Sequence, residues 1–268
     1  MAARTRRAPP RAPVQDDDER VYGLRAALAA IEQRPDDVLR FAYSGEHAPV
    51  LAELVAWAAE HDIPTRELDD DALAEFSGSN HHEGLCVATR PRAWATPKEL
   101  GAFLLAGPRC AVALDRVRNP YNVGAILRTC AFFGLEAVLF GPMAPEPSLA
   151  PNAVRVAEGG AEHLLLARTM DLGESLGRLR RSGIAVLGAD GESSTSALGY
   201  TFPERAVLVL GNEREGLSPH VRAQCDAVLA IPGSGAVESL NVSVAASVLV
   251  AELVRPRLLA PARRVFSR

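Results

Sequence analysis

The hydrophobic residues in the second half of the chain form short apolar runs that alternate with longer amphipathic runs. We expect strands at 111–114, 137–140, 184–188, 206–210 and 227–231, and helices at 123–133, 150–158, 172–181 and 241–253. Apolar strands that alternate with helices are typical of a parallel sheet with helices on both faces. The pattern therefore predicts an α/β domain over residues 109–256.

A smaller α/β pattern comes before it, over residues 20–91. Helices are expected at 21–31, 50–60 and 70–76, and strands at 38–43, 63–68 and 85–89. Residues 92–108 are rich in proline and glycine and indicate a linker with a short helix at 98–105. Residues 1–19 are charged and proline-containing, which predicts a disordered tail, and residues 257–268 are expected to form a C-terminal tail.

Composition limits the possible functions. Apolar residues make up 48% of the 268 residues and charged residues 23%, as in a globular protein with a substantial core. The net charge of −4 means that any contact with nucleic acid requires a local basic face. The four cysteines stand singly, which argues against a zinc site or a disulfide framework and for a reducing compartment. Because there is no apolar run of bilayer length and no signal-peptide core, we expect a cytoplasmic protein without a membrane partner.

A first polar cluster follows the strand predicted at 111–114. It contains Asn122, directly before the helix expected at 123–133, and Arg128, within that otherwise apolar helix. If helix geometry already holds at Asn122, six residues advance about 600°, which leaves the two side chains about 120° apart. They share a site only if the loop turns Asn122 inward. Buried arginines are rare unless they are paired or functional, and the structural alternative is a salt bridge of Arg128 with Glu158 or Glu213.

Two further polar clusters also follow predicted strands. Gly211 and Glu213 come after the strand at 206–210, and Ser239 and Asn241 stand at the start of the last apolar helix. Ligands of open parallel sheets bind at the carboxyl ends of the strands. Serine and asparagine are also good helix caps, so capping is the alternative interpretation of the third cluster. Three polar loops at one sheet edge favour a shared site.

Several common sites are not indicated by the sequence. The dinucleotide motif GxGxxG, the phosphate loop GxxxxGK[ST] and the hydrolase elbow GxSxG are all absent. His81, His82 and Glu83 invite a metal hypothesis, but neighbouring side chains point in different directions and no third ligand is spaced nearby. We therefore expect no metal, and a polar turn that faces RNA is the preferred interpretation of these three residues.

Taken together, three stretches resemble the SpoU/TrmH family of RNA ribose 2′-O-methyltransferases, in the SPOUT superfamily. They are NPYNVGAILRT (119–129), LVLGNEREGL (208–217) and IPGSGAVESLNVSVA (231–245). The segment 154–164 fits the intervening region, and the first domain resembles the ribosomal-protein-like RNA-binding domain that often precedes this catalytic domain. The resemblance implies a deep trefoil knot, S-adenosylmethionine as cofactor, and a homodimer formed through the knotted domain.

The resemblance also implies roles for individual residues. Gly211, Ile231 and Leu240 match positions that hold the cofactor, mostly through backbone groups, and Ala189 is a fourth such position. Arg128 matches the arginine that is proposed to be catalytic in this family. The polar residues that surround that arginine in the family correspond here to Asn122, Glu213, Ser239 and Asn241.

Methyl transfer to a ribose hydroxyl requires in-line positioning and removal or sharing of the hydroxyl proton. Arginine is protonated in proteins, so Arg128 either deprotonates when it is desolvated and pinned or binds the adjacent phosphate and orients the hydroxyl. In both versions Ser239 and Asn241 fix the ribose and Glu213 orients Arg128.

The sequence predicts an RNA 2′-O-methyltransferase that acts on structured tRNA or rRNA. Two alternatives stay open at this point. One is a non-catalytic RNA-binding or ribosome-associated factor on the same fold, and the other is methylation of a base.

Overall fold

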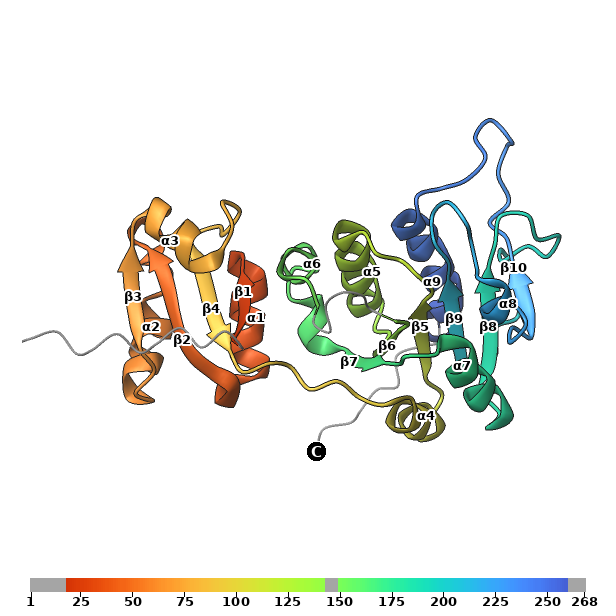
Figure 1. Cartoon of the computed structure of the whole chain (residues 1–268), viewed down its shortest axis with the longest axis horizontal. Coiled ribbons are helices and arrows are strands. Elements are labelled where there is room, and N and C mark those ends of the chain that lie inside the picture. Colours follow the sequence, from red (N-terminus) through yellow and green to blue (C-terminus); the bar gives the residue numbers. More distant parts are fainter. Residues whose placement is uncertain (1–17, 143–148, 260–268) are drawn as a thin grey trace, which may run out of the picture.

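The computed structural model describes residues 18–142 and 149–259, which form two α/β domains side by side (Figure 1). We call residues 19–89 the small domain, and residues 95–142 and 149–259 the large domain. The predicted tail falls outside the described residues up to position 17. Its last residues differ from the prediction, because Asp18 pairs with Arg40 and Glu19 begins a strand. Most of the predicted C-terminal tail, from residue 260, also lies outside the described residues.

The small domain is built on a four-stranded sheet in the order β1-β4-β2-β3. Its elements are β1 (Glu19–Tyr22), α1 (Leu24–Gln33), η1 (Pro35–Asp37), β2 (Val38–Ser44), η2 (Gly45–His47), α2 (Ala52–Glu60), β3 (Thr65–Leu68), α3 (Asp70–Ser77) and β4 (Leu85–Thr89). Strand β1 corrects the prediction of a helix from residue 21. Val21 pairs with Val87 in an antiparallel ladder, and Gly23 has φ +94°, a value that ends the strand before α1 begins.

The large domain is built on a six-stranded, all-parallel sheet in the order β10-β8-β9-β5-β6-β7. Its elements are α4 (Pro97–Leu105), β5 (Cys110–Leu114), α5 (Pro120–Phe132), β6 (Ala137–Phe140), α6 (Pro151–Val156), η3 (Gly160–His163), β7 (Leu165–Arg168), α7 (Leu172–Arg181), β8 (Ala185–Ala189), β9 (Ala206–Leu210), α8 (Pro219–Arg222), β10 (Ala227–Leu229) and α9 (Val242–Leu259). The predicted parallel sheet is confirmed. Strand β7, at the edge of the sheet, has no counterpart in the prediction.

Helices cover both faces of the large sheet because successive residues of a strand point to opposite sides. Val112 and Leu114 of β5 pack in the core that contains α5 and α9. Ala111 and Ala113 of the same strand pack in a second core, with side chains of α4, α7 and α8. The linker helix α4 therefore belongs to the covering layer of the large domain.

The two domains are joined by a buried cluster of ion pairs and by apolar packing. Glu162 of η3 accepts hydrogen bonds from Arg34 (2.9 Å) of the α1 end and from Arg92 (2.9 Å) of the linker. Arg92 also pairs with Glu19 of β1 at 2.5 Å. Side chains of α1 and β1 share one hydrophobic core with those of α6. The small domain is therefore docked firmly on the segment that contains α6 and η3.

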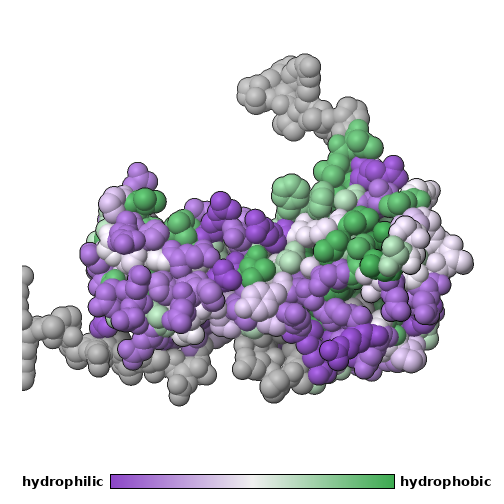
Figure 2. Space-filling view, turned by 90° about the horizontal axis from the view of Figure 1, so that it is seen from above, coloured by the Kyte–Doolittle hydropathy of each residue, from purple (hydrophilic) through white to green (hydrophobic). Residues whose placement is uncertain are grey.

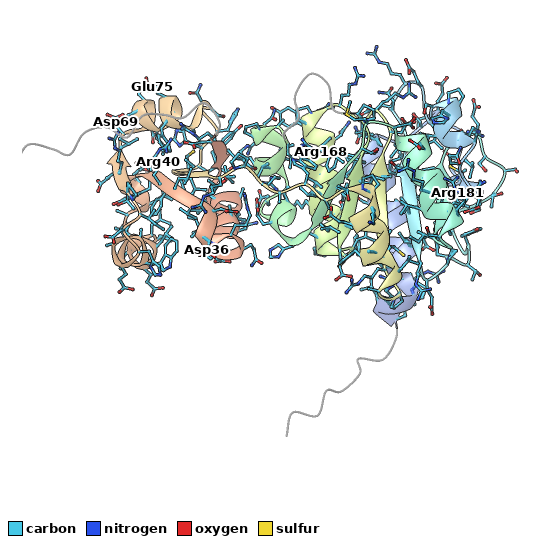
Figure 3. The ribbon with its side chains drawn as sticks, turned by 60° about the horizontal axis from the view of Figure 1, so that its bottom comes forward. Asp36, Arg40, Asp69, Glu75, Arg168 and Arg181 are labelled. Atoms are coloured by element: carbon cyan, nitrogen blue, oxygen red, sulfur yellow. The ribbon has the colours of Figure 1, made fainter. Side chains whose placement is uncertain are left out.

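The surfaces of the two domains differ. Figure 2 shows hydrophobic residues gathered on the large domain, whereas the small domain is mostly hydrophilic in the same view. In Figure 3, Asp69 and Glu75 lie at the outer end of the small domain and Arg168 lies near the middle of the molecule. The guanidinium of Arg168 is 5.5 Å from the ring centre of Trp94, where the linker crosses the sheet edge.

The sequence suggested neither a membrane-spanning helix nor a metal site, and the described residues bear on both points. No helix among them is both long and apolar enough to span a membrane. No group of three or more His, Cys, Asp or Glu side chains in the described part of the chain could hold a metal ion, and this includes the surroundings of His81 and His82.

Candidate active site

The strand register brings three of the predicted cofactor positions to one edge of the large sheet. Ala189 at the end of β8 pairs with Leu210 of β9 and with Leu229 of β10. Gly211 follows Leu210 directly, and Ile231 comes two residues after Leu229. This edge is formed by the carboxyl ends of the strands, where open parallel sheets bind their ligands.

A chain of side-chain hydrogen bonds connects the three polar clusters. The amide Nδ2 of Asn122, on α5, donates to Oε1 of Glu213 at 2.5 Å. The amide Nδ2 of Asn241, at the start of α9, donates to Oδ1 of Asn122 at 3.1 Å. Asn122 is 8% exposed, so the middle of this chain is buried. Segments that are separated by about a hundred residues in the sequence therefore meet in one network.

Asn241 is also the cap of helix α9. Its Oδ1 accepts hydrogen bonds from the backbone N–H (2.9 Å) and the hydroxyl (2.6 Å) of Ser243. The capping interpretation is thus correct for Asn241, and the same side chain uses its other amide atom in the network. The preceding loop, residues 232–241, is exposed and projects from the large domain (Figure 1). Ser239 and Leu240 lie on this loop, and Leu240 is 47% exposed.

Arg128 lies outside this network. Residues Pro120–Phe132 are helical, so Asn122 is already part of the helix and the two side chains leave it in different directions. The side chain of Arg128 is 56% exposed, and its Nη1 lies 3.7 Å from Oε1 of Glu158. Of the two partners that the sequence suggested for a structural salt bridge, Glu158 is the one in contact. Glu213 instead bonds to Asn122.

Two residues that the sequence analysis did not single out shape the loop after β9. Asp115, 4% exposed, accepts a hydrogen bond from the backbone N–H of Ser218 at 2.6 Å. Asn212 donates to the backbone carbonyl of Arg116 at 3.1 Å and accepts from the N–H of Arg214 at 2.9 Å. A carboxylate directly after the buried strand at 110–114 was the available signal for Asp115.

Two titratable groups near the site have shifted pKa values. The backbone N–H of Glu192, together with Arg222, holds the pKa of Asp190 below its ordinary value, although burial opposes the shift. Burial raises the pKa of Cys130, on α5, to about 12. A thiol with that pKa is protonated at neutral pH, so Cys130 does not act as a nucleophile.

Gly211 has no room for a side chain. A β-carbon there would lie 2.3 Å from the backbone carbon of Gly216 and 2.6 Å from the backbone nitrogen of Leu217. We expect Gly211→Ala to lower the free energy of unfolding by about 1–3 kcal/mol, because backbone atoms on both sides of the loop must move. Urea unfolding of this variant against Gly107→Ala tests the expectation, since a β-carbon at position 107 meets no atom closer than 3.8 Å. Equal stability of the two variants would contradict it.

Two of the predicted cofactor positions offer unpaired backbone donors. Within the described part of the chain, the N–H groups of Ile231 and Leu240 donate to no protein acceptor, whereas Gly211 continues the parallel ladder of β8 and β9. Free backbone donors beside a strand end suit a ligand that is held by main-chain contacts. The residues present therefore fit a cofactor that binds across the ends of β8, β9 and β10.

Comparison with known sequences places the chain in a family. The family model described as "SpoU rRNA Methylase family" matches residues 109–251, and "RNA 2'-O ribose methyltransferase substrate binding" matches residues 20–94. The chain belongs to the SpoU rRNA methylase family. It is 36% identical, over 96% of its length and 80% of the relative's, to an uncharacterized tRNA/rRNA methyltransferase of Mycobacterium tuberculosis. It is 33% identical to the uncharacterized tRNA/rRNA methyltransferase YfiF of Escherichia coli O157:H7, over 88% and 68%.

Solved structures agree with this family. The SpoU methyltransferase AviRb from Streptomyces viridochromogenes, in complex with AdoMet, matches with a TM-score of 0.75 at 24% identity, over 90% of this chain and 91% of the other. A putative RNA methyltransferase of the TrmH family from Porphyromonas gingivalis matches with a TM-score of 0.69 at 27% identity, over 90% and 91%. This SpoU protein is thus an RNA methyltransferase with an α/β fold, and its trefoil knot stays a prediction.

Proposed function

We propose that this SpoU methyltransferase transfers a methyl group from S-adenosylmethionine to a ribose 2′-hydroxyl of tRNA or rRNA. The observation that carries the proposal is the hydrogen-bonded chain from Glu213 through Asn122 to Asn241, beside the free backbone donors of the strand ends. This hydrogen-bonded network holds amide and carboxylate groups at fixed positions. Such groups can align a ribose hydroxyl with the methyl group that it is to accept. A substrate-binding segment of the ribose methyltransferase type precedes it at residues 20–94.

The cofactor is assigned to the edge formed by β8, β9 and β10. S-adenosylmethionine supplies a methyl group that its positively charged sulfur makes reactive. Ile231 and Leu240 hold the cofactor through their unpaired backbone N–H groups, and Gly211 contacts it through its backbone. Ala189 ends β8, the strand that lies between β9 and β10, and contacts the cofactor there. The backbone of Gly216 and Leu217 lies directly against Gly211, so the loop after β9 packs tightly beside this edge.

The substrate side is assigned to the polar residues around the network. Asn241 and Ser239 fix the ribose, and Asn122 holds Glu213 in place through its hydrogen bond. Arg128 removes the proton of the hydroxyl when desolvated, or binds the neighbouring phosphate and orients the hydroxyl. Because Arg128 is half-exposed and turned away from Asn122 in one chain, either role requires a further surface that covers it.

That surface is a second copy of the chain. Tyr121 and Phe132 are 54% and 82% exposed, and with Arg128 they follow the helix positions i, i+7 and i+11, which lie within about 40° of one another on α5. Val244 of the neighbouring helix α9 is 49% exposed. Exposed apolar side chains on adjacent helices are typical of a protein interface. A homodimer through α5 and α9 covers Arg128 and desolvates it.

Replacing Phe132 with glutamate is expected to convert the dimer to a monomer. Interfaces with twofold symmetry bring the same patch from both subunits together, so each dimer would bury two new carboxylates. Light scattering after size exclusion measures the mass, with Met170→Glu as the control because Met170 is 87% exposed on the loop before α7. A dimeric Phe132→Glu protein, or a monomeric wild type, would contradict the assignment.

Transfer of labelled methyl from S-adenosylmethionine to RNA tests the proposed activity. The protein is incubated separately with total tRNA and with rRNA from a strain that lacks it, so that its target positions are unmethylated. We expect label in one of the two pools, and we expect the protein to work in the cytoplasm where these RNAs are found. Absence of label in both pools, with binding of the cofactor demonstrated, would favour the non-catalytic RNA-binding factor.

A further inference from the structure

Glu158 contacts both the small domain and the candidate catalytic arginine. Its Oε2 accepts a hydrogen bond from Nη1 of Arg25, on α1, at 2.9 Å. Its Oε1 lies 3.7 Å from Nη1 of Arg128, on α5. One carboxylate therefore bridges a residue of the domain that binds substrate RNA and a residue of the domain that carries the methyl-transfer site.

The backbone of Glu158 is in a conformation that disfavours a residue with a β-carbon. Glu158 follows α6 with φ +51°, and the next residue, Gly159, has φ +88°. Glycine adopts such angles freely, whereas other residues are strained there. The packing around such a residue must hold it in place, so its conformation supports a hypothesis that the contacts of Glu158 then have to carry.

The turn that contains Glu158 is packed directly on the helix of Arg128. A β-carbon on Gly160 would lie 3.1 Å from the Cα of Arg128 and 3.2 Å from the carbonyl oxygen of Leu127. The turn and the helix are therefore in close backbone contact. This contact brings the backbone of Glu158 close enough to α5 for its carboxylate to reach the guanidinium of Arg128.

We propose that Glu158 is a positioning residue, which holds the guanidinium of Arg128 for methyl transfer and ties it to the small domain through Arg25. The inference rests on the proposed function of Arg128. Arg25, His47 and His82 also line an open cavity of about 680 Å³ in the small domain, and Glu158 borders it from the large domain. RNA that docks on the small domain beside this cavity is thus linked to the arginine through a single carboxylate.

Turnover of Glu158→Gln, compared with Glu174→Gln, tests the proposal. Glu174 is the control, because its side chain also forms an exposed ion pair, with Arg178, and lies on α7, which covers the other face of the sheet from Arg128. We expect kcat of Glu158→Gln to fall about two- to fivefold, as for loss of a partly exposed ion pair. KM for S-adenosylmethionine and the melting temperature should match those of Glu174→Gln. Equal kcat values for the two variants would overturn the proposal.

Glycine at the same position separates positioning from folding. Glu158→Gly relieves the backbone, so its melting temperature should be no lower than that of the wild type, while its kcat falls as in Glu158→Gln. Arg25→Gln should lower kcat in the wild type and have no further effect in the Glu158→Gln background. A lower melting temperature with unchanged kcat in Glu158→Gly would mean that the side chain is only structural, and would overturn the proposal.

An Arg128→Ala variant measured in the same series distinguishes the two levels of failure. If Arg128→Ala is inactive and the Glu158 variants turn over as fast as Glu174→Gln, only the positioning role is wrong. If Arg128→Ala keeps full turnover, the proposed role of Arg128 is wrong, and the role of Glu158 fails with it.

Discussion

Replacing Arg128 with alanine is expected to lower kcat about 10²–10⁴-fold, the usual contribution of a group that accepts or shares a proton in the transition state. The affinity for S-adenosylmethionine should not change, because Arg128 lies on α5, whereas the positions assigned to the cofactor lie at the ends of β8 and β9, after β10 and in the loop before α9. Single-turnover methylation together with calorimetric binding of the cofactor measures both quantities.

The control for this prediction is Arg178→Ala. Arg178 is an arginine of similar exposure, with a side chain that is 66% exposed, and it lies on α7, which covers the opposite face of the sheet. Its loss should leave kcat within twofold of the wild type, by the ordinary behaviour of surface residues (about 0.5 kcal/mol). Arg128→Lys should recover little activity, since lysine keeps the charge and loses the planar fork. Turnover of Arg128→Ala equal to that of Arg178→Ala would contradict both roles suggested for Arg128.

Replacing Glu162 with glutamine is expected to lower the free energy of unfolding by about 1.5–3 kcal/mol, the usual contribution of hydrogen bonds to a buried charged group. The side chains of Glu162 and Arg92 are 1% and 6% exposed. Burial alone would lower the pKa of Arg92, but Glu162 and Glu19 raise it, and the net pKa is raised. Arg92 therefore keeps its charge. In the variant it keeps Glu19 as a carboxylate partner and loses the charge of Glu162, on which Arg34 also depends.

Urea unfolding followed by circular dichroism measures this loss, with Glu83→Gln as the reference. Glu83 takes part in another ion pair between the domains, but its side chain is 44% exposed, so its loss should change stability by less than about 1 kcal/mol. A Glu162→Gln protein as stable as Glu83→Gln would show that the cluster around Glu162 does not hold the domains together.

Most of the large domain could be predicted from the sequence because its strands are continuous apolar runs. Five strands and the helices between them follow from this pattern, and the parallel sheet follows from their alternation. Strands β1 and β7 were not predicted, for different reasons. Strand β1 is only four residues long, and Gly23 alone separates it from helix α1. The hydrophobic pattern of the two elements together is therefore typical of a single helix. Strand β7 follows the short turn η3 and lies at the edge of the sheet.

The candidate site was predictable in part. Asn122, Glu213 and Asn241 meet in space, as expected for three polar loops at one edge of a parallel sheet. The contact of Arg128 with Glu158 could only be offered as an alternative, because it depends on the packing of α5 against the turn after α6. The exposure of Phe132 could not be predicted, because its sequence neighbours are also apolar. A pattern of hydrophobic residues does not distinguish a helix face that packs in the core from one that forms an interface. Both gaps concern contacts between elements, and local sequence carries little information about these.

The position of the new methyl group within the modified nucleotide distinguishes ribose from base methylation. RNA labelled by the protein is digested to nucleosides, and mass spectrometry of the fragments separates the sugar from the base. We expect one site at which the extra methyl mass stays with the ribose, and at which the adjacent phosphodiester resists alkaline cleavage because its 2′-oxygen is blocked. A methyl mass that stays with the base would rule out 2′-O-methylation and assign this SpoU protein to base methylation.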